Sequence, residues 1–99
     1  MLDIEQVEKV MSGRSFNKTS VSKDDGQIVS VSFCTRHLDG MDITCTVNLV
    51  KETFRLGWSV PNSINRLETP ECSPLSDDEH FSRLYDKLHR QVEILYWNI

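Results

Sequence analysis

The sequence has no uninterrupted apolar stretch of about 18 residues, the length at which a chain becomes a candidate membrane-spanning helix. It also has no excess of positive charge, since 15 acidic and 11 basic residues give a net charge of −4. A protein that holds nucleic acid by neutralising phosphates usually presents a basic surface. We therefore expect no membrane partner, and we do not expect nucleic acid to be the main ligand.

The sequence contains only three cysteines, an odd number. Cys34, Cys45 and Cys72 are 11 and 27 positions apart, which fits neither paired disulfides nor the Cys-x-x-Cys spacing of zinc sites. The first residues also lack the basic segment and apolar segment of a secretory signal. These features predict free thiols and a cytoplasmic protein.

Glycine is scarce too, and the motifs of common enzyme classes are missing. The chain has four glycines and no glycine-rich phosphate loop, and no serine stands in a Gly-x-Ser-x-Gly turn. Cys34 and His37 are three positions apart, which on a strand directs their side chains to opposite faces. We therefore predict no catalytic site, no metal site and no cofactor, and we interpret the protein as non-enzymatic.

Residues 3–12 have the spacing of a short amphipathic helix, with Val7 and Met11 on its apolar stripe. Asp3 is typical of the residue that caps a helix N-terminus. Gly13 is the candidate for the left-handed residue that ends the helix.

Between residues 16 and 60, apolar residues alternate with polar ones, as in strands with one buried face. Short links containing Gly26 and Gly40 predict an antiparallel meander of four strands, the first of them polar. Alternation also predicts the register, because the apolar sets must share a face. The expected cross-strand pairs are Phe33 with Cys45, Arg36 with Asp42, Val21 with Val29, and Leu49 with Phe54.

The strongest helix pattern covers residues 77–96. Ser76 as N-cap and Glu79 three positions later form the signature of a capping box. Apolar residues then recur at intervals of three and four. They are Phe81, Leu84, Tyr85, Leu88, Val92 and Leu95.

These elements predict an α+β fold in two layers, formed as a single domain over residues 1–99. Its expected order is an N-terminal helix, a four-stranded antiparallel β-meander, a long proline-containing loop at residues 61–75, and a C-terminal helix packed on one face of the sheet. The other sheet face, rich in serine and threonine, is interpreted as an ordinary solvated face, a docking surface or a homodimer contact.

The loop is longer than most connections in a small domain, which is typical of functional loops. Residues 67–79 contain five acids and no base. We predict that this segment contacts a partner through Glu68 and Glu71, with Leu67 and Leu75 as apolar anchors. The alternative is a simple link in which the last three acids stabilise the start of the helix.

The C-terminal helix carries a second, basic stripe of His80, Arg83, Lys87 and Arg90, which continues to Ile94 and ends at the aromatic Trp97. The stripe is interpreted either as a binding strip or as a solvated face. We predict a small acidic protein-binding module that docks on a larger protein with a basic surface: an inhibitor, an immunity protein or an adaptor of the kind that mobile elements encode. The alternative function is a small-molecule or nucleic-acid binder that uses the basic stripe.

Overall fold

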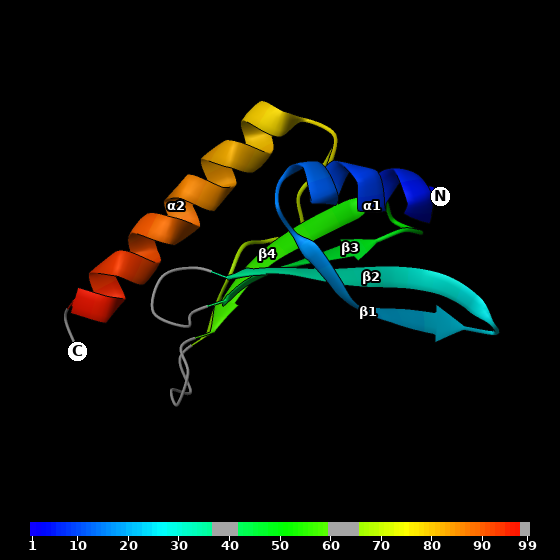
Figure 1. Ribbon diagram of the computed structural model, residues 1–99, viewed down its shortest axis with the longest axis horizontal. Helices are drawn as coiled ribbons and strands as arrows, with labels where there is room; N and C mark the ends of the chain where they lie inside the picture. The colour runs from blue at the N-terminus through cyan, green and yellow to red at the C-terminus, as the bar shows by residue number, and fades with distance from the viewer. Residues whose placement is uncertain (37–41, 60–65, 98–99) are drawn as a thin grey trace.

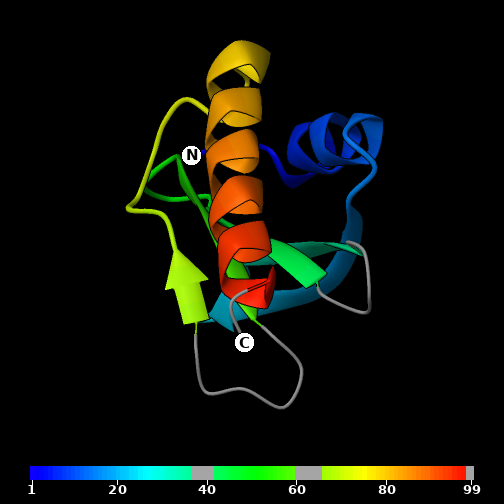
Figure 2. The same cartoon turned by 90° about the vertical axis from the view of Figure 1, so that its left-hand side faces the viewer.

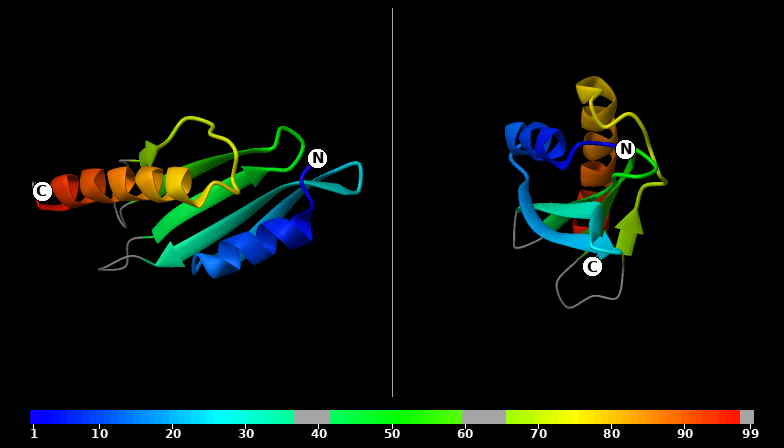
Figure 3. Two further views of the ribbon diagram at one scale, coloured as in Figure 1. Left: turned by 90° about the horizontal axis from the view of Figure 1, so that it is seen from above. Right: turned by 90° about the vertical axis from the view of Figure 1, so that its right-hand side faces the viewer.

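The computed structural model describes residues 1–36, 42–59 and 66–97 and confirms an α+β fold (Figure 1). A five-stranded antiparallel sheet has the order β1-β2-β3-β4-β5, and both helices lie on one side of it (Figures 2 and 3). The elements in chain order are α1 (Ile4–Gly13), β1 (Asn17–Asp24), β2 (Gln27–Arg36), β3 (Asp42–Asn48), β4 (Thr53–Ser59), β5 (Arg66–Glu68) and α2 (Asp78–Trp97).

The register between β2 and β3 is as predicted. Phe33 lies opposite Cys45, and Arg36 lies opposite Asp42. Both strands carry a full apolar set, and this pairing places the two sets on the same face. A slip of two residues would also do so, but only the observed register sets Arg36 opposite Asp42. The loop predicted over residues 38–40 lies outside the described residues.

The predicted register between β1 and β2 is wrong. The strands are joined by a two-residue turn in which Asp25 and Gly26 both have positive φ, at 51° and 79°. Two register shifts follow along the hairpin, and Val21 pairs with Val31 instead of Val29. Every residue of β1 is exposed, so burial does not fix its register and the turn and bulges decide it.

The link between β3 and β4 is also longer than predicted. Phe54 pairs with Val47, not with Leu49. The Asn48 side chain determines this turn, because its Oδ1 accepts the backbone N–H groups of Val50 at 3.1 Å and Lys51 at 3.0 Å. The shift of two positions leaves every side chain on its predicted face.

The fifth strand lies inside the segment that we predicted to be an irregular loop. In β5, Leu67 pairs with Trp58 of β4, and the backbone of Cys72 then exchanges hydrogen bonds of 2.8 and 2.9 Å with Phe54. Residues 66–72 therefore run along the edge of β4. Such pairing satisfies backbone groups that an exposed edge would leave open.

Both ends of α1 have side-chain or backbone caps. Asp3 Oδ1 accepts the Glu5 N–H at 3.0 Å, which confirms Asp3 as the N-cap. The predicted stop at Gly13 is wrong, because the left-handed residue is Ser15 with φ 65°. The Phe16 N–H reaches the Met11 carbonyl at 3.0 Å, which closes the turn as a Schellman motif around Ser15.

The helix α2 begins one residue later than predicted, because Asp77 is its cap instead of Ser76. The Asp77 Oδ1 accepts the His80 N–H at 3.0 Å, and the Asp77 carbonyl accepts the Phe81 N–H at 3.0 Å. An aspartate carboxylate caps well and also favours the positive end of the helix dipole.

The core lies between the helices and the sheet. Phe33, Val47, Trp58, Phe81 and Leu88 are buried in it, whereas Leu84 is half-buried. The Phe81 ring joins the layers, with centroids 5.8 Å from Phe16 and 5.6 Å from Phe54. Helix α2 thus packs against β4 and against the segment that follows α1.

Candidate functional site

The sheet face opposite the helices is a surface of small polar side chains, called here the polar face. Within the described ranges no helix covers it (Figure 2). Its residues form three rows that cross the strands. The rows are Ser22, Ser30, Asn48 and Thr53; Ser20, Ser32, Thr46 and Arg55; and Cys34, Thr44, Gly57 and Glu68.

Glu68 lies on this polar face and packs closely across β4. A Cβ atom on Gly57 would stand 3.5 Å from the Glu68 Cγ and 3.2 Å from the Thr44 Oγ1. The absence of a side chain at Gly57 therefore leaves room for the stem of Glu68. Glu68, which we predicted to lie in an irregular loop, is therefore part of the sheet.

Glu71 joins the same surface. A hollow of about 340 Å³ opens on the polar face, with Glu68 and Glu71 on one side and Arg55 and Asn48 among its other walls. Ser30, Thr46, Thr53 and Phe54 complete its lining. The structure thus unites two features that the sequence analysis treated separately, the acidic segment and the polar face.

The two predicted apolar anchors have another role. Leu75 is only 5% exposed and belongs to the core. Leu67 is half-buried and packs against the same core. The Leu75 side chain attaches the acidic segment to the core, because burial of its apolar surface is favourable there. Its contact with a partner stays a prediction.

The remaining acids of the segment serve the start of α2, as the alternative interpretation proposed. Asp77 caps the helix, Glu79 pairs with Arg83 at 3.0 Å, and Asp78 pairs with Arg14. The acidic segment therefore divides into two parts. Glu68 and Glu71 form a charged edge of the polar face, where both line the same hollow.

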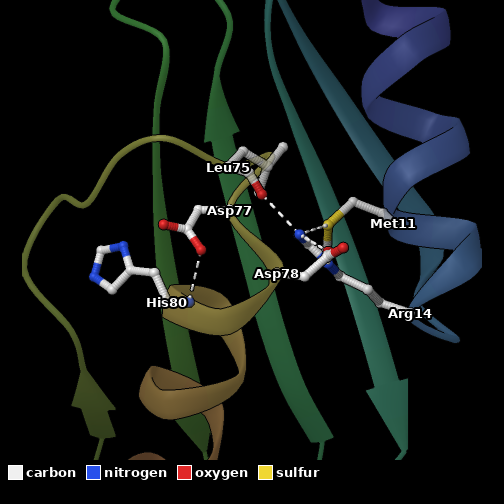
Figure 4. A network of polar contacts seen from close by, with 6 residues as sticks. All are labelled: Met11, Arg14, Leu75, Asp77, Asp78 and His80. Carbon is white, nitrogen blue, oxygen red and sulfur yellow. Dashed lines mark hydrogen bonds and ion pairs between the residues drawn. The ribbon is translucent and has the colours of Figure 1, made fainter.

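Arg14 is an organising residue that the sequence analysis missed. Its Nη2 donates to the Leu75 carbonyl at 2.8 Å, and its Nε donates to Asp78 Oδ1 at 3.0 Å (Figure 4). Its guanidinium carbon lies 4.1 Å from the centroid of the Phe81 ring. A single arginine after a helix has no sequence signal that distinguishes it, because the two oxygen atoms that it binds belong to residues more than sixty positions away.

The predicted basic stripe forms a second hollow, of about 350 Å³, on the outer side of α2. Arg83, Lys87 and Arg90 line it together with Asp86, Gln91 and Ile94. Ile94 is 61% exposed. Trp97 is the last residue of α2, and its side chain lies outside the described part of the structure.

The cysteines are free, and they differ in their surroundings. Burial raises the pKa of the Cys45 thiol to about 12, although the Arg14 guanidinium opposes the shift. Burial, and secondarily Asp42, raise the pKa of Cys34, which is half-buried on the polar face. Both environments favour the neutral thiol over the reactive thiolate.

Across residues 1–36, 42–59 and 66–97, no three side chains of His, Cys, Asp or Glu gather as a metal ion would require. In the same ranges, neither helix combines the length and the apolar character needed to cross a membrane. Comparison with known proteins finds no matching family, no matching curated protein and no matching solved structure.

Proposed function

We propose that the protein is a non-enzymatic protein-binding module that docks on the basic surface of a larger protein. The docking surface is the polar face with its acidic edge at Glu68 and Glu71. The observation that carries the proposal is the shared hollow, which joins the two acids to Arg55 and Asn48 on an open face of the sheet. An inhibitor, an immunity protein or an adaptor can each act through such a surface.

The polar face has physical properties that suit docking. Its side chains are mostly serine, threonine and asparagine, which allow a partner to approach the backbone closely. The sheet holds them in cross-strand rows, so little conformational entropy would be lost on binding. The two acids lie at the rim, where charge mainly accelerates encounter and selects partners of opposite charge.

The test reverses the charge of the acidic edge in the double variant Glu68→Lys, Glu71→Lys. A partner captured from the native host and identified by mass spectrometry is titrated with the wild type and the variant over a range of salt. We expect association at low salt to slow by about tenfold and its salt dependence to weaken. Glu5→Lys, Glu93→Lys, an equal charge change at exposed positions of α1 and α2, is the matched control. Unchanged kinetics in the double variant would contradict the proposal.

A second candidate function uses the basic stripe to bind a small anionic molecule or nucleic acid. The supporting observation is that Arg83, Lys87 and Arg90 line one open hollow. Asp86 also lines this hollow, and Glu79 pairs with Arg83, so the positive charge of the hollow is partly compensated. Fluorescence anisotropy with a single-stranded oligonucleotide tests this function. The wild type must bind the oligonucleotide, and the double variant Arg83→Glu, Lys87→Glu must abolish that binding.

A further inference from the structure

An apolar hollow of about 260 Å³ lies on the helix side of the molecule, between α1 and the segment that leads into α2. Its apolar lining consists of Leu2, Val7, Val10, Pro74 and Leu75. Val7 and Leu75 are nearly buried, whereas Leu2 and Val10 are half-buried. The hollow is smaller than the roughly 300 to 1,000 Å³ of sites for drug-sized ligands, and its size suits a single side chain.

The two sides of this hollow are held in place by contacts elsewhere in the fold. The Leu2 N–H donates to the Leu49 carbonyl at 2.8 Å, which fixes the chain just before α1. At the other end of α1, Arg14 donates to the Leu75 carbonyl at 2.8 Å (Figure 4). The hollow therefore exists before any partner binds, and a bound side chain need not open it.

The rim of the hollow carries negative charge. Asp3 and Glu52 contribute carboxylates to the lining, and among the described residues no lysine or arginine side chain does. Asp3 is engaged as the α1 cap, and Glu52 lies 3.7 Å from the amino group of Met1. Exposed pairs of this kind are weak, so the rim favours cationic groups next to an apolar one.

The hollow is also close to the proposed docking surface along the chain. Glu71 lines the hollow of the polar face, and Pro74 lines the apolar hollow. Three residues of chain span at most about 11 Å. Between them, the Cys72 backbone pairs with Phe54, which holds this segment against β4. A partner that crosses the edge of the sheet here would meet both hollows.

We infer that the apolar hollow receives one aliphatic side chain of the basic partner, flanked by lysine or arginine residues that face Asp3 and Glu52. This inference rests on the proposed function and adds its apolar anchor. Interfaces commonly draw most of their binding energy from a few side chains that fill such pockets, while surrounding charges contribute selectivity.

The test uses three synthetic peptides as probes: acetyl-Lys-Leu-Lys-amide, acetyl-Lys-Ser-Lys-amide and acetyl-Glu-Leu-Glu-amide. Each is titrated at millimolar concentration into the isotope-labelled full chain, and methyl and amide NMR shifts are recorded. We expect Lys-Leu-Lys to shift Leu2, Val7 and Val10. The serine peptide should bind about tenfold more weakly because it lacks the apolar side chain, and the acidic peptide about fivefold more weakly because of the rim.

Val10→Lys should reduce binding of the leucine peptide by about tenfold, since it places a charge in the wall of the hollow. Val50→Lys, at an exposed position outside the lining, is the control and should bind as the wild type does. Amide spectra of both variants verify that each remains folded. Glu52→Gln should reduce the preference for the basic peptide over the acidic one.

Three results would overturn the inference. Shifts confined to the polar face around Thr46 and Arg55 would remove the apolar anchor and leave the docking surface standing. Equal binding of all three peptides, or no binding of any of them, would also remove the anchor. The proposed function would then still be judged separately by the Glu68→Lys, Glu71→Lys variant and its captured partner.

Discussion

Replacing Arg14 by methionine should destabilise the protein by about 2 to 3 kcal/mol. The largest contribution is the hydrogen bond to the Leu75 carbonyl, because a bond from a charged donor is worth about 1.5 to 3 kcal/mol. The cation–π contact with Phe81 adds about 0.5 to 1 kcal/mol. Methionine keeps an apolar stem in the same place, which offsets part of the loss.

The ion pair with Asp78 contributes little to this total. The Asp78 side chain is 85% exposed, and exposed ion pairs are worth about 0 to 1 kcal/mol. Asp78→Ala should therefore cost about 1 kcal/mol or less, including the weaker interaction with the helix dipole. Comparison of the two variants separates the stability contributed by the buried contacts of Arg14 from that contributed by its exposed ion pair with Asp78.

Urea unfolding followed by circular dichroism measures both changes, with Arg14→Lys as a third variant. Lysine keeps the charge but lacks the planar group that donates to Leu75 and Asp78 from two nitrogens, so most of the loss should remain. If Arg14→Met cost less than about 0.5 kcal/mol, or no more than Asp78→Ala, the proposed role of Arg14 in holding α1 to α2 would be wrong.

Three further substitutions and one labelling experiment test the fold itself. Ser15→Gly should stabilise the protein by about 0.5 to 1 kcal/mol, because Ser15 has a positive φ that glycine adopts without strain. Gly13→Ala should stabilise it by a similar amount, because Gly13 lies in the helix. Urea midpoints measure both changes, and a destabilising Gly13→Ala would mean that the helix ends at Gly13 instead. Leu88→Ala should cost about 2 to 5 kcal/mol, and an unchanged thermal melt would refute the packing of α2 on the sheet. A thiol reagent should label Cys34 in the folded protein and Cys45 only after denaturation. Because the pKa of Cys34 is raised, its labelling rate should still increase with pH above 9.0, the ordinary pKa of a thiol. Equal reactivity of both cysteines in the folded protein would contradict the register of β2 and β3.

The register of β2 and β3 was predictable because two signals agree. Each strand presents a complete apolar set, so a slip of one residue would expose it, and the opposite charges of Arg36 and Asp42 select among the registers that remain. Between β3 and β4 the prediction depended on alternation alone, and it was wrong. A slip of two between β3 and β4 keeps every face, and only the Asn48 turn distinguishes the two registers.

The polar site was predictable in its composition but not in its geometry. Glu68 and Glu71 were identified from their charge, in a segment whose prolines indicated a loop. Their position depends on the pairing of residues 66–72 with β4, which is set by backbone groups and carries little side-chain pattern. The same pairing sets Leu67 opposite Trp58 and packs it against the core, which the sequence pattern alone does not indicate.

The position of β5 also predicts that the charge at Glu71 can be changed without unfolding this segment. The segment is held by backbone pairing to β4, by Leu75 in the core and by the Arg14 bond to the Leu75 carbonyl. None of these contacts involves the carboxylate of Glu71. A surface whose scaffold is fixed independently of its charges can change its binding preference without losing its shape, which is the property that a docking module for one particular partner requires.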